Sequence, residues 1–449
     1  MLKVLLVTSL ALFTDRYQLT MLAAYARSGL AQRRAVFELF VRRLPASRRY
    51  LVACGIARAP LSELSFSESD LARFEADAFL GAAMQNREVR ELFERFRFRG
   101  RVLCVPEGRI CYPHEPLIRV EGTLAEAQLV ETLLLSIVNH DTRVASKCAR
   151  IVTAAQGREC FEFGTRRTHE HAAVDAARAA YVAGFSSTSN EEAGRRYGIP
   201  VTGTMAHAFV LAHAADHGED GERAAFRSFA DTFSVSPTFL VDTFDTLRGV
   251  DRASEVAKLA GVRIDSGDLA ALALKARTRL DLAGQPNARV VLSDDLDEYK
   301  IDALARALIP VDAFGVGTMA VATPDAPSLG AVYKLVALED ATGKMVAVQK
   351  RAGGKGSSAA PKQVFRHQGV DVIAMEGESH PGEALLQPID EMDLSLTAAR
   401  ARLVADLADT PPRLRSIEPR RDDEGFPVRR SDALEALHAR VDREGRVVL

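Results

Sequence analysis

Three short polar segments within residues 161–207 carry the residue types of an anion-binding active site. One predicted strand ends in Phe163–Arg167, a second runs into Ser186–Asn190, and Gly203–His207 follows a third. Because the C-terminal ends of strands share one face of a β/α fold, we expect the arginines, hydroxyls and histidine to meet in one pocket. Arginines suit an anionic substrate, and a histidine suits nucleophilic attack or proton transfer. This face is therefore predicted to hold the active site.

Two later strand ends carry carboxylates. Asp265-Ser266-Gly267-Asp268 follows a strand over 262–264, and Ser293–Glu298 repeats the arrangement after the next strand. Carboxylates at such positions suit ribose hydroxyls, directly or through Mg²⁺. A structural role is equally open, because Asp268 could cap the next helix and an acidic first turn favours the helix dipole. Arg263 should point to the same side of its strand as Asp265, so an ion pair between them is possible.

Two further signals are weaker. Phe314–Thr318 is a glycine-spaced strand end whose backbone N–H groups could bind phosphate, although a lone G-x-G-T is not a fingerprint. His207 is expected at the start of a helix over 206–215, where an isolated histidine is more often structural than catalytic. His213 and His217 have H-x-x-x-H spacing, but no third ligand lies nearby, so a zinc site is not expected.

Composition limits the classes of partner. The chain has 449 residues, enough for two or three domains, and its 58 basic and 60 acidic residues leave a net charge of -2. That balance gives no global attraction to nucleic acid. The five cysteines form no C-x-x-C pair, which is typical of reduced thiols in a cytosolic protein. No apolar run reaches the roughly 18–20 residues of a membrane span. We expect a cytoplasmic protein that binds neither membrane nor nucleic acid.

The elements that must position these groups follow a repeating pattern. A long helix is expected from Thr123, with Glu126 completing a capping box, and a final helix over 431–441. Between them the predicted strands lie at 159–163, 182–185, 200–202, 239–241, 262–264, 289–292, 313–316 and 332–336. Seven or eight strand–helix units favour a closed β/α barrel over an open sheet. Gly353–Pro361 is either a lid loop carrying Lys355 or an ordinary linker.

The order of these motifs resembles that of nicotinate phosphoribosyltransferases from about residue 10 to residue 366. The segments that carry the resemblance are Thr14–Met21, Phe37–Arg42, Phe163–Arg167, Thr188–Asn190, Gly203–His207, Leu240–Thr243, Arg263–Asp268, Gly315–Thr318 and Val332–Val336. The resemblance implies an α/β fold: an incomplete, irregular α/β barrel, an N-terminal α/β sandwich domain and a small C-terminal region. It places the N-terminal domain at 1–122, the catalytic barrel at 123–345, and at 346–449 a lid loop and C-terminal region that completes the N-terminal domain.

The resemblance also implies an activity. The family joins nicotinate to 5-phosphoribosyl 1-diphosphate, giving nicotinate mononucleotide and diphosphate for NAD salvage. The reaction is coupled to ATP hydrolysis through a phosphorylated histidine, which matches His207, and it uses ATP and Mg²⁺. The family acts as a homodimer whose active sites are shared between subunits.

Residue roles follow from the same motif matching. His207 and Asp265 are the expected catalytic residues, and Mg²⁺ could bind Asp265 or Asp295. Tyr17, from the partner subunit, and Phe163 should sandwich the pyridine ring. The expected substrate contacts also include Arg166, Ser189, Gly203, Thr204, Arg263, Ser266, Gly267, Asp268, Ser293, Asp294, Gly315, Gly317 and Thr318, of which the Gly315–Thr318 segment should hold the 5′-phosphate.

Substrate choice is expected to depend on Ser189. Related nicotinamide enzymes carry an aspartate there, which would repel a carboxylate ligand, so Ser189 favours nicotinate. Ser187 and Asp294 replace a glycine and an asparagine of the family pattern. They keep open two alternatives: a paralogue for another aromatic acid and a non-catalytic member that only binds a metabolite.

Overall fold

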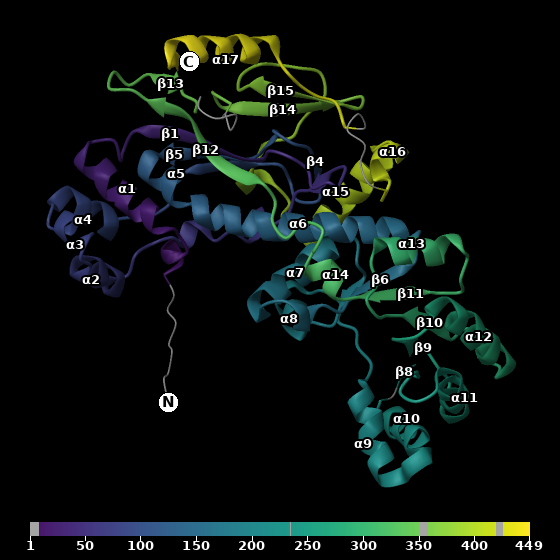
Figure 1. The fold of residues 1–449 in the computed structure, drawn as a ribbon. Coiled ribbons are helices and arrows are strands. Elements are labelled where there is room, and N and C mark those ends of the chain that lie inside the picture. Colours follow the sequence, from purple (N-terminus) through teal and green to yellow (C-terminus); the bar gives the residue numbers. More distant parts are fainter. Residues whose placement is uncertain (1–8, 234, 351–357, 419–424) are drawn as a thin grey trace. The chain divides into compact units, whose positions relative to one another are not determined.

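The computed structural model describes residues 9–233, 235–350, 358–418 and 425–449 (Figure 1). The chain divides into two compact units, with Met1–Thr142, Ser328–Leu414 and Arg420–Leu449 in the first and Arg143–Pro327 and Arg415–Pro419 in the second. The division at residues 1–122, 123–345 and 346–449 stays a prediction. Lys355, and with it most of the predicted lid or linker, lies outside the described residues.

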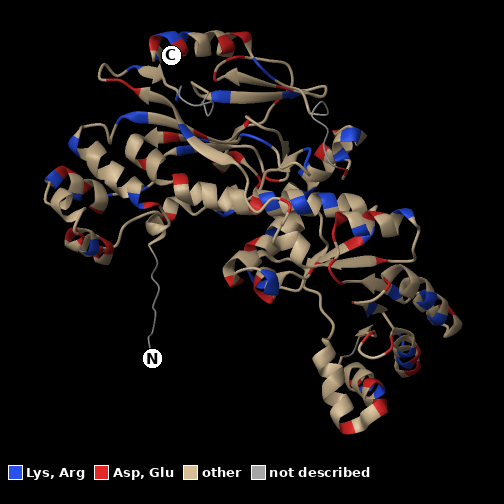
Figure 2. Cartoon of the chain, in the orientation of Figure 1, with Lys and Arg blue, Asp and Glu red and all other residues tan. Residues whose placement is uncertain are grey.

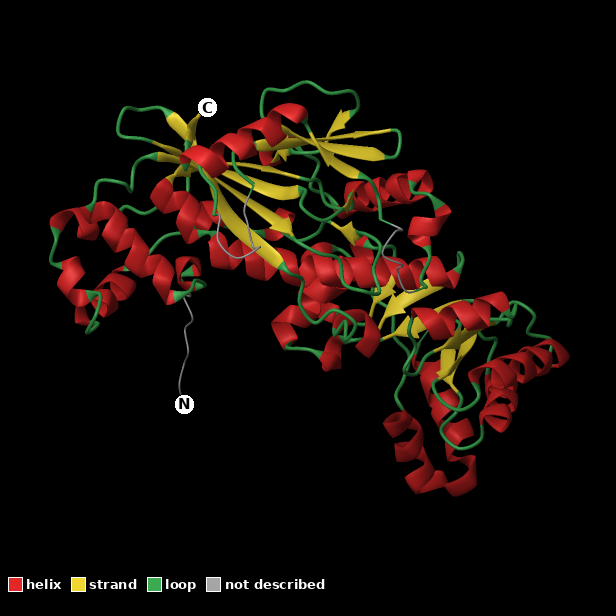
Figure 3. Cartoon of the chain, turned by 45° about the horizontal axis from the view of Figure 1, so that its top comes forward, coloured by secondary structure: helices red, strands yellow, loops and turns green. Residues whose placement is uncertain are grey.

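The first unit is built on a seven-stranded antiparallel sheet whose strands come from both N-terminal and C-terminal segments. Figure 3 draws the strands of the molecule in yellow and its helices in red. Its strands, in spatial order, are β17 (Gln387–Pro388), β3 (Arg101–Cys104), β5 (Pro116–Thr123), β1 (Arg34–Val41), β12 (Ala331–Glu339), β13 (Met345–Ala347) and β19 (Val447–Val448). The strand expected at 332–336 is therefore real but was assigned to the wrong sheet. It pairs antiparallel with β1, where the ring of Tyr333 stacks on Phe37 at 5.0 Å.

Smaller sheets and helices complete this unit. A four-stranded sheet runs in the order β16 (Glu383–Ala384), β14 (Lys362–His367), β15 (Val370–Met375) and β18 (Val428–Arg430), and β2 (Leu51–Val52) pairs with β4 (Ile110–Cys111). The helices are α1 (Arg16–Arg27), α2 (Glu68–Ala76), α3 (Gly81–Met84), α4 (Arg87–Glu94), α5 (Leu124–Leu129), α15 (Leu396–Asp409), α16 (Pro412–Arg415) and α17 (Asp432–Glu444). The boundary between the units falls within helix α6 (Glu131–Ala155).

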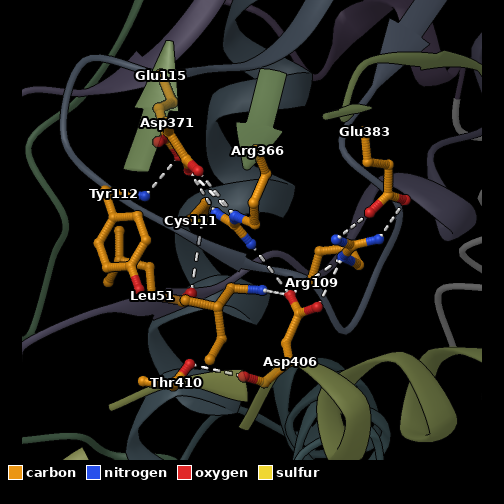
Figure 4. Close-up of polar contacts among 11 residues, drawn as sticks. Leu51, Arg109, Cys111, Tyr112, Glu115, Arg366, Asp371, Glu383, Asp406 and Thr410 are labelled. Atoms are coloured by element: carbon orange, nitrogen blue, oxygen red, sulfur yellow. Dashed lines mark hydrogen bonds and ion pairs between the residues drawn. The ribbon is translucent and has the colours of Figure 1, made fainter. Parts of the chain in front are cut away.

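A largely buried ionic network ties parts of the first unit together (Figure 4). Arg366 of β14 donates to Asp371 of β15 at 2.6 Å, and Arg109 donates to Glu383 of β16 at 2.6 Å. Asp406 of α15 contacts both guanidinium groups, at 3.3 Å from Arg366 and 3.0 Å from Arg109. The network therefore joins segments that are almost 300 residues apart in the sequence.

The second unit contains a six-stranded parallel sheet. Its order is β7 (Ser187–Thr188), β6 (Glu159–Glu162), β11 (Ala313–Val316), β10 (Arg289–Leu292), β9 (Gly261–Ile264) and β8 (Thr238–Leu240). Its helices are α7 (Glu170–Val182), α8 (Glu191–Tyr197), α9 (His207–His217), α10 (Gly221–Thr232), α11 (Thr246–Val256), α12 (Leu269–Leu282), α13 (Glu298–Arg306) and α14 (Thr318–Val321).

This sheet is an incomplete α/β barrel, so the implied fold is confirmed and the closed barrel suggested by strand number is wrong. Strands β7 and β8 are the two edges of the sheet. Two of the counted strands do not contribute as expected: residues 332–336 belong to the other unit, and 200–202 supplies only a bridge between Val201 and Thr188. The strand expected at 182–185 starts later, because Val182 still belongs to α7.

Local signals for helix ends are accurate. Thr123 accepts a hydrogen bond from the Glu126 amide, and the Glu126 carboxylate accepts one from the Thr123 amide, so the predicted capping box is present. Basic and acidic residues, coloured blue and red in Figure 2, are interspersed along helices of both units. Within the described residues, no helix combines the length and the apolar character needed to cross a membrane.

Candidate active site

A cavity of about 280 Å³ lies at the C-terminal ends of the parallel strands of the second unit. It is lined by Phe163, Arg166, Ser189, Gly203, Thr204, Met205, Ala206, His207, Leu240, Arg263 and Asp265. The structure thus brings together the strand-end residues that the sequence predicted to meet. The cavity holds two guanidinium groups and an imidazole, which can donate to an anionic substrate, and one carboxylate, which can accept hydrogen bonds from hydroxyl groups.

The aromatic wall of the cavity is the ring of Phe163, directly after β6. The Phe163 amide donates to the Val316 carbonyl at 2.9 Å, and the Arg263 guanidinium lies 5.3 Å from the centre of the ring. Gly315 of β11 makes room for this ring, because a Cβ atom there would lie 2.5 Å from two of its carbons. A glycine at 315 therefore has a packing role in addition to the phosphate contact that the sequence predicts.

Arg263, Asp265 and Ser293 form a closed triangle at the ends of β9 and β10. Arg263 donates to Asp265 Oδ1 at 2.9 Å and to Ser293 Oγ at 2.7 Å. Ser293 Oγ in turn donates to the same Asp265 oxygen at 2.5 Å. The Arg263–Asp265 ion pair considered from the sequence is thus present, and it fixes a cation and a carboxylate side by side at the cavity wall.

His207 is the first residue of α9, as expected from the sequence. Its Nδ1 lies 3.1 Å from the Oγ1 of Thr243, which follows β8. That contact occupies one ring nitrogen and leaves Nε2 as the nitrogen available for chemistry. The sequence argument missed Thr243, although the segment Leu240–Thr243 was one of the motifs that carry the resemblance.

Asp242 is the second residue that the sequence argument missed. Its Oδ2 accepts hydrogen bonds from the Asp265 amide at 3.0 Å and from Ser266 Oγ at 2.6 Å, so it ties the end of β8 to the end of β9. Its Oδ1 is buried and has no hydrogen-bond partner in the described structure. A strand end carrying a carboxylate, as at Asp265, was the signal that could have identified it.

The donor set fits Mg²⁺ shared with a substrate. Mg²⁺ needs only one or two protein carboxylates when waters and phosphates supply its other ligands. Asp265 lines the cavity, and Asp242 does not line it but accepts a hydrogen bond from the Asp265 amide, so the two carboxylates offer such a pair; Asp295 is exposed and does not line the cavity. In the described part of the chain no group of three or more His, Cys, Asp or Glu residues could hold a metal by itself.

Gly267, Asp268 and Asp294, which were predicted to contact the ribose, do not line the cavity. Asp268 caps α12 by accepting a hydrogen bond from the Ala271 amide at 3.0 Å, so the helix cap considered from the sequence is present. Gly267 adopts a left-handed backbone conformation with φ of 86°, and the exposed Asp294 does so with φ of 126°. Their predicted ribose contacts stay predictions.

The predicted contacts of Gly317, Thr318 and Tyr17 involve residues that do not line the cavity. Gly317 directly precedes α14, and Thr318 is its first residue, so first-turn amides that a phosphate could accept from lie at this strand end. Tyr17 belongs to the first unit, on α1, and is 48% exposed. Its role toward a partner subunit stays a prediction.

Ser187 is buried within β7 and does not line the cavity, whereas Ser189 does.

Comparison with known proteins assigns the chain to a family. The nicotinate phosphoribosyltransferase N-terminal domain matches residues 12–139, and the nicotinate phosphoribosyltransferase family model matches residues 158–376. A nicotinate phosphoribosyltransferase of Mycobacterium tuberculosis (strain H37Rv) is 45% identical over 397 residues, covering 86% of each chain. One of Bacillus subtilis (strain 168) is 43% identical over 390 residues, covering 82% of this chain and 77% of its own. The crystal structure of human nicotinic acid phosphoribosyltransferase matches with a TM-score of 0.79 at 26% identity, covering 96% of this chain and 99% of that one. The chain belongs to the nicotinate phosphoribosyltransferase family.

Proposed function

We propose that this chain joins nicotinate to 5-phosphoribosyl 1-diphosphate, giving nicotinate mononucleotide and diphosphate for NAD salvage. The observation that carries the proposal is the single cavity shared by Phe163, Arg166, His207, Arg263 and Asp265. Relatives that are 41–45% identical have the name of this enzyme, which supports the same assignment.

The base would bind against the aromatic wall. The face of the Phe163 ring suits an offset stack with a pyridine, and the Arg166 guanidinium suits the nicotinate carboxylate. We place Tyr17 of the partner subunit on the other face of the base, in a homodimer with shared sites. Ser189 adds a neutral hydroxyl at the cavity wall, which does not repel an acid.

Transfer would break the anomeric C–O bond to diphosphate and form a C–N bond to the pyridine nitrogen. Positive charge develops on the sugar as the C–O bond breaks, and the Asp265 carboxylate can stabilise it while Arg263 holds the leaving diphosphate. Gly317 and Thr318 are the proposed 5′-phosphate contacts. Mg²⁺ held by Asp242 and Asp265 would neutralise negative charge on the diphosphate.

ATP would act through His207. Nε2 attacks the γ-phosphate, the bond to ADP breaks, and a phosphohistidine forms at the cavity wall. Thr243 holds Nδ1, which keeps the ring oriented for that attack. The five cysteines are buried free thiols, which supports a reducing, cytoplasmic location.

The proposal is tested by base selectivity. Purified chain is mixed with phosphoribosyl diphosphate, Mg²⁺ and ATP, and mononucleotide is measured with nicotinate or nicotinamide as the base. We expect product from nicotinate and little from nicotinamide. Preference for nicotinamide, or product only with another pyridine carboxylic acid, would contradict the assignment of the base.

A further inference from the structure

Glu162 is a buried carboxylate at the end of β6, immediately before Phe163. It is 1% exposed and lies opposite Thr188 of β7 and Val316 of β11 in the parallel sheet. No Lys, Arg or His in the described chain forms an ion pair with it. Burying a carboxylate without a cation costs free energy unless hydrogen bonds stabilise the carboxylate. The hydrogen-bond partners of Glu162 therefore indicate its role.

Both oxygens of Glu162 accept hydrogen bonds from the two segments that line the cavity, 163–166 and 188–190. Oε2 accepts from Thr188 Oγ1 at 2.5 Å, and Oε1 accepts from the Gly164 amide. Two donors converging on one carboxylate is the pattern of its ionised form. Burial raises the pKa of Glu162, while the hydrogen bonds from Thr188 and Gly164 oppose that rise.

The two hydrogen-bond donors, Gly164 and Thr188, do not line the cavity themselves but are next in the sequence to residues that do. Gly164 lies between Phe163 and Arg166, and Thr188 directly precedes Ser189. Phe163, Arg166 and Ser189 all line the cavity. The Thr188 hydroxyl also accepts a hydrogen bond from the Asn190 amide at 3.0 Å, so the backbone on both sides of Ser189 is linked to this hydroxyl. One carboxylate therefore fixes both segments that carry the proposed base-binding residues.

We propose that Glu162 is a positioning residue that sets the spacing of Phe163 and Arg166 relative to Ser189 and thereby determines the affinity for nicotinate. This inference rests on the proposed function. Arg263 and Asp265, the proposed contacts of phosphoribosyl diphosphate, are held by hydrogen bonds that do not involve Glu162, namely their triangle with Ser293. Glu162 should accordingly affect binding of the base and leave binding of phosphoribosyl diphosphate unchanged.

The test compares Glu162→Gln, Thr188→Val and the double variant with the wild type. Glutamine keeps one acceptor oxygen but turns an N–H₂ group toward the other donor, and valine removes the Thr188 donor. The matched control is Glu159→Gln on the same strand, where the exposed Glu159 pairs with Arg289 at the surface. For each protein we would measure the KM of each substrate, kcat, the nicotinate Kd by calorimetry and Tm.

We expect each single variant to raise the KM and Kd of nicotinate by about tenfold, with the KM of phosphoribosyl diphosphate within about twofold of wild type. The double variant should be no worse than Glu162→Gln, because both changes break one hydrogen-bonded unit. Glu159→Gln should match the wild type.

Other results overturn the inference in distinguishable ways. Wild-type nicotinate KM in both Glu162→Gln and Thr188→Val removes the positioning role and leaves the proposed function standing. Equal rises in both substrate KM values together with a lower Tm would show a structural role only. A wild-type chain that neither binds nor converts nicotinate would overturn the proposed function and this inference together.

Discussion

The chemistry of single residues in this site depends on the neighbours that fix them. His207 is oriented by Thr243, and Arg263 and Asp265 are fixed to each other and to Ser293. Because hydrogen bonds hold these groups in place without substrate, little reorganisation is needed when a charged ligand binds.

His207→Ala should abolish phosphorylation of the chain by ATP. The imidazole is the proposed phosphate acceptor, and alanine is well tolerated at the start of α9, so the fold should be retained. The measurement is acid-labile, base-stable label transferred from γ-labelled ATP. His213→Ala, on the same helix but outside the cavity lining, should keep the label. Full labelling of His207→Ala would remove His207 from the mechanism.

Ser189→Asp should weaken nicotinate binding. An added carboxylate at the cavity wall would repel the nicotinate carboxylate, and we expect its KM to rise by about tenfold or more. Ser189→Asn, similar in size but neutral, separates charge from bulk and should have a much smaller effect. An unaltered nicotinate KM in Ser189→Asp would show that this position does not face the ring substituent.

At the scale of elements, the site depends on close packing between β6 and β11. The Phe163 ring occupies the space above Gly315, and the Arg263 guanidinium lies over the same ring. The backbone of one strand thus determines where an aromatic side chain of its neighbour can lie.

Gly315→Ala should displace the Phe163 ring. The added methyl group would lie 2.5 Å from two ring carbons, well inside van der Waals contact. We expect unfolding free energy to fall by about 1–3 kcal/mol and nicotinate KM to rise. Thermal unfolding and steady-state kinetics measure both effects. Gly330→Ala is the control, because nothing lies within 4 Å of a Cβ atom there, and a wild-type result for both variants would contradict the packing role.

Sequence reasoning was most accurate where the signal is local. The strand at 289–292 and the capping box at Thr123 both lie where the residue pattern predicted them, because each depends on neighbours along the chain. The strand at 332–336 was assigned to the wrong sheet, since alternation of side chains does not identify a pairing partner.

The same limit applies to the site. Phe163, Arg166 and His207 could be selected by residue type at predicted strand ends, and all three line the cavity. Thr243 and Glu162 act through contacts with residues 36 and 26 positions away, respectively, so only the fold reveals them.

At the scale of the whole molecule, a buried network stabilises the first unit, whereas the cavity belongs to the second. One acid of this network is Glu115, which is fully buried and accepts a hydrogen bond from the Tyr112 amide at 2.8 Å (Figure 4). Burial, together with the nearby Asp371 carboxylate, raises the pKa of Glu115. The folded chain therefore holds a proton on Glu115 more tightly than the unfolded chain does.

This linkage predicts a stability that declines with rising pH. A group whose pKa is raised on folding contributes fully below its unfolded value of about 4.3 and loses that contribution as pH rises through the folded value. Glu115→Gln cannot ionise, so the Tm of the wild type should fall relative to that of Glu115→Gln as the pH rises above about 5. A Tm difference that is constant, or that changes in the other direction, would contradict a protonated Glu115.

Glu383→Gln is the control in the same network, because the pKa of Glu383 is lowered on folding whereas that of Glu115 is raised. The hydrogen bond from Arg109 lowers the pKa of Glu383, so its contribution is present above the unfolded value and is lost as pH falls. The two variants should therefore depart from the wild type at opposite ends of the pH range.

The most direct test of the account is the formation of nicotinate mononucleotide by the wild-type chain, with nicotinate, phosphoribosyl diphosphate and Mg²⁺, in the presence and absence of ATP. The account predicts turnover that ATP accelerates, because phosphorylation of His207 acts in the cavity where the transfer occurs. Absence of mononucleotide under both conditions would contradict the assignment of the cavity as a nicotinate phosphoribosyltransferase site, and turnover that ATP leaves unchanged would contradict the role of His207.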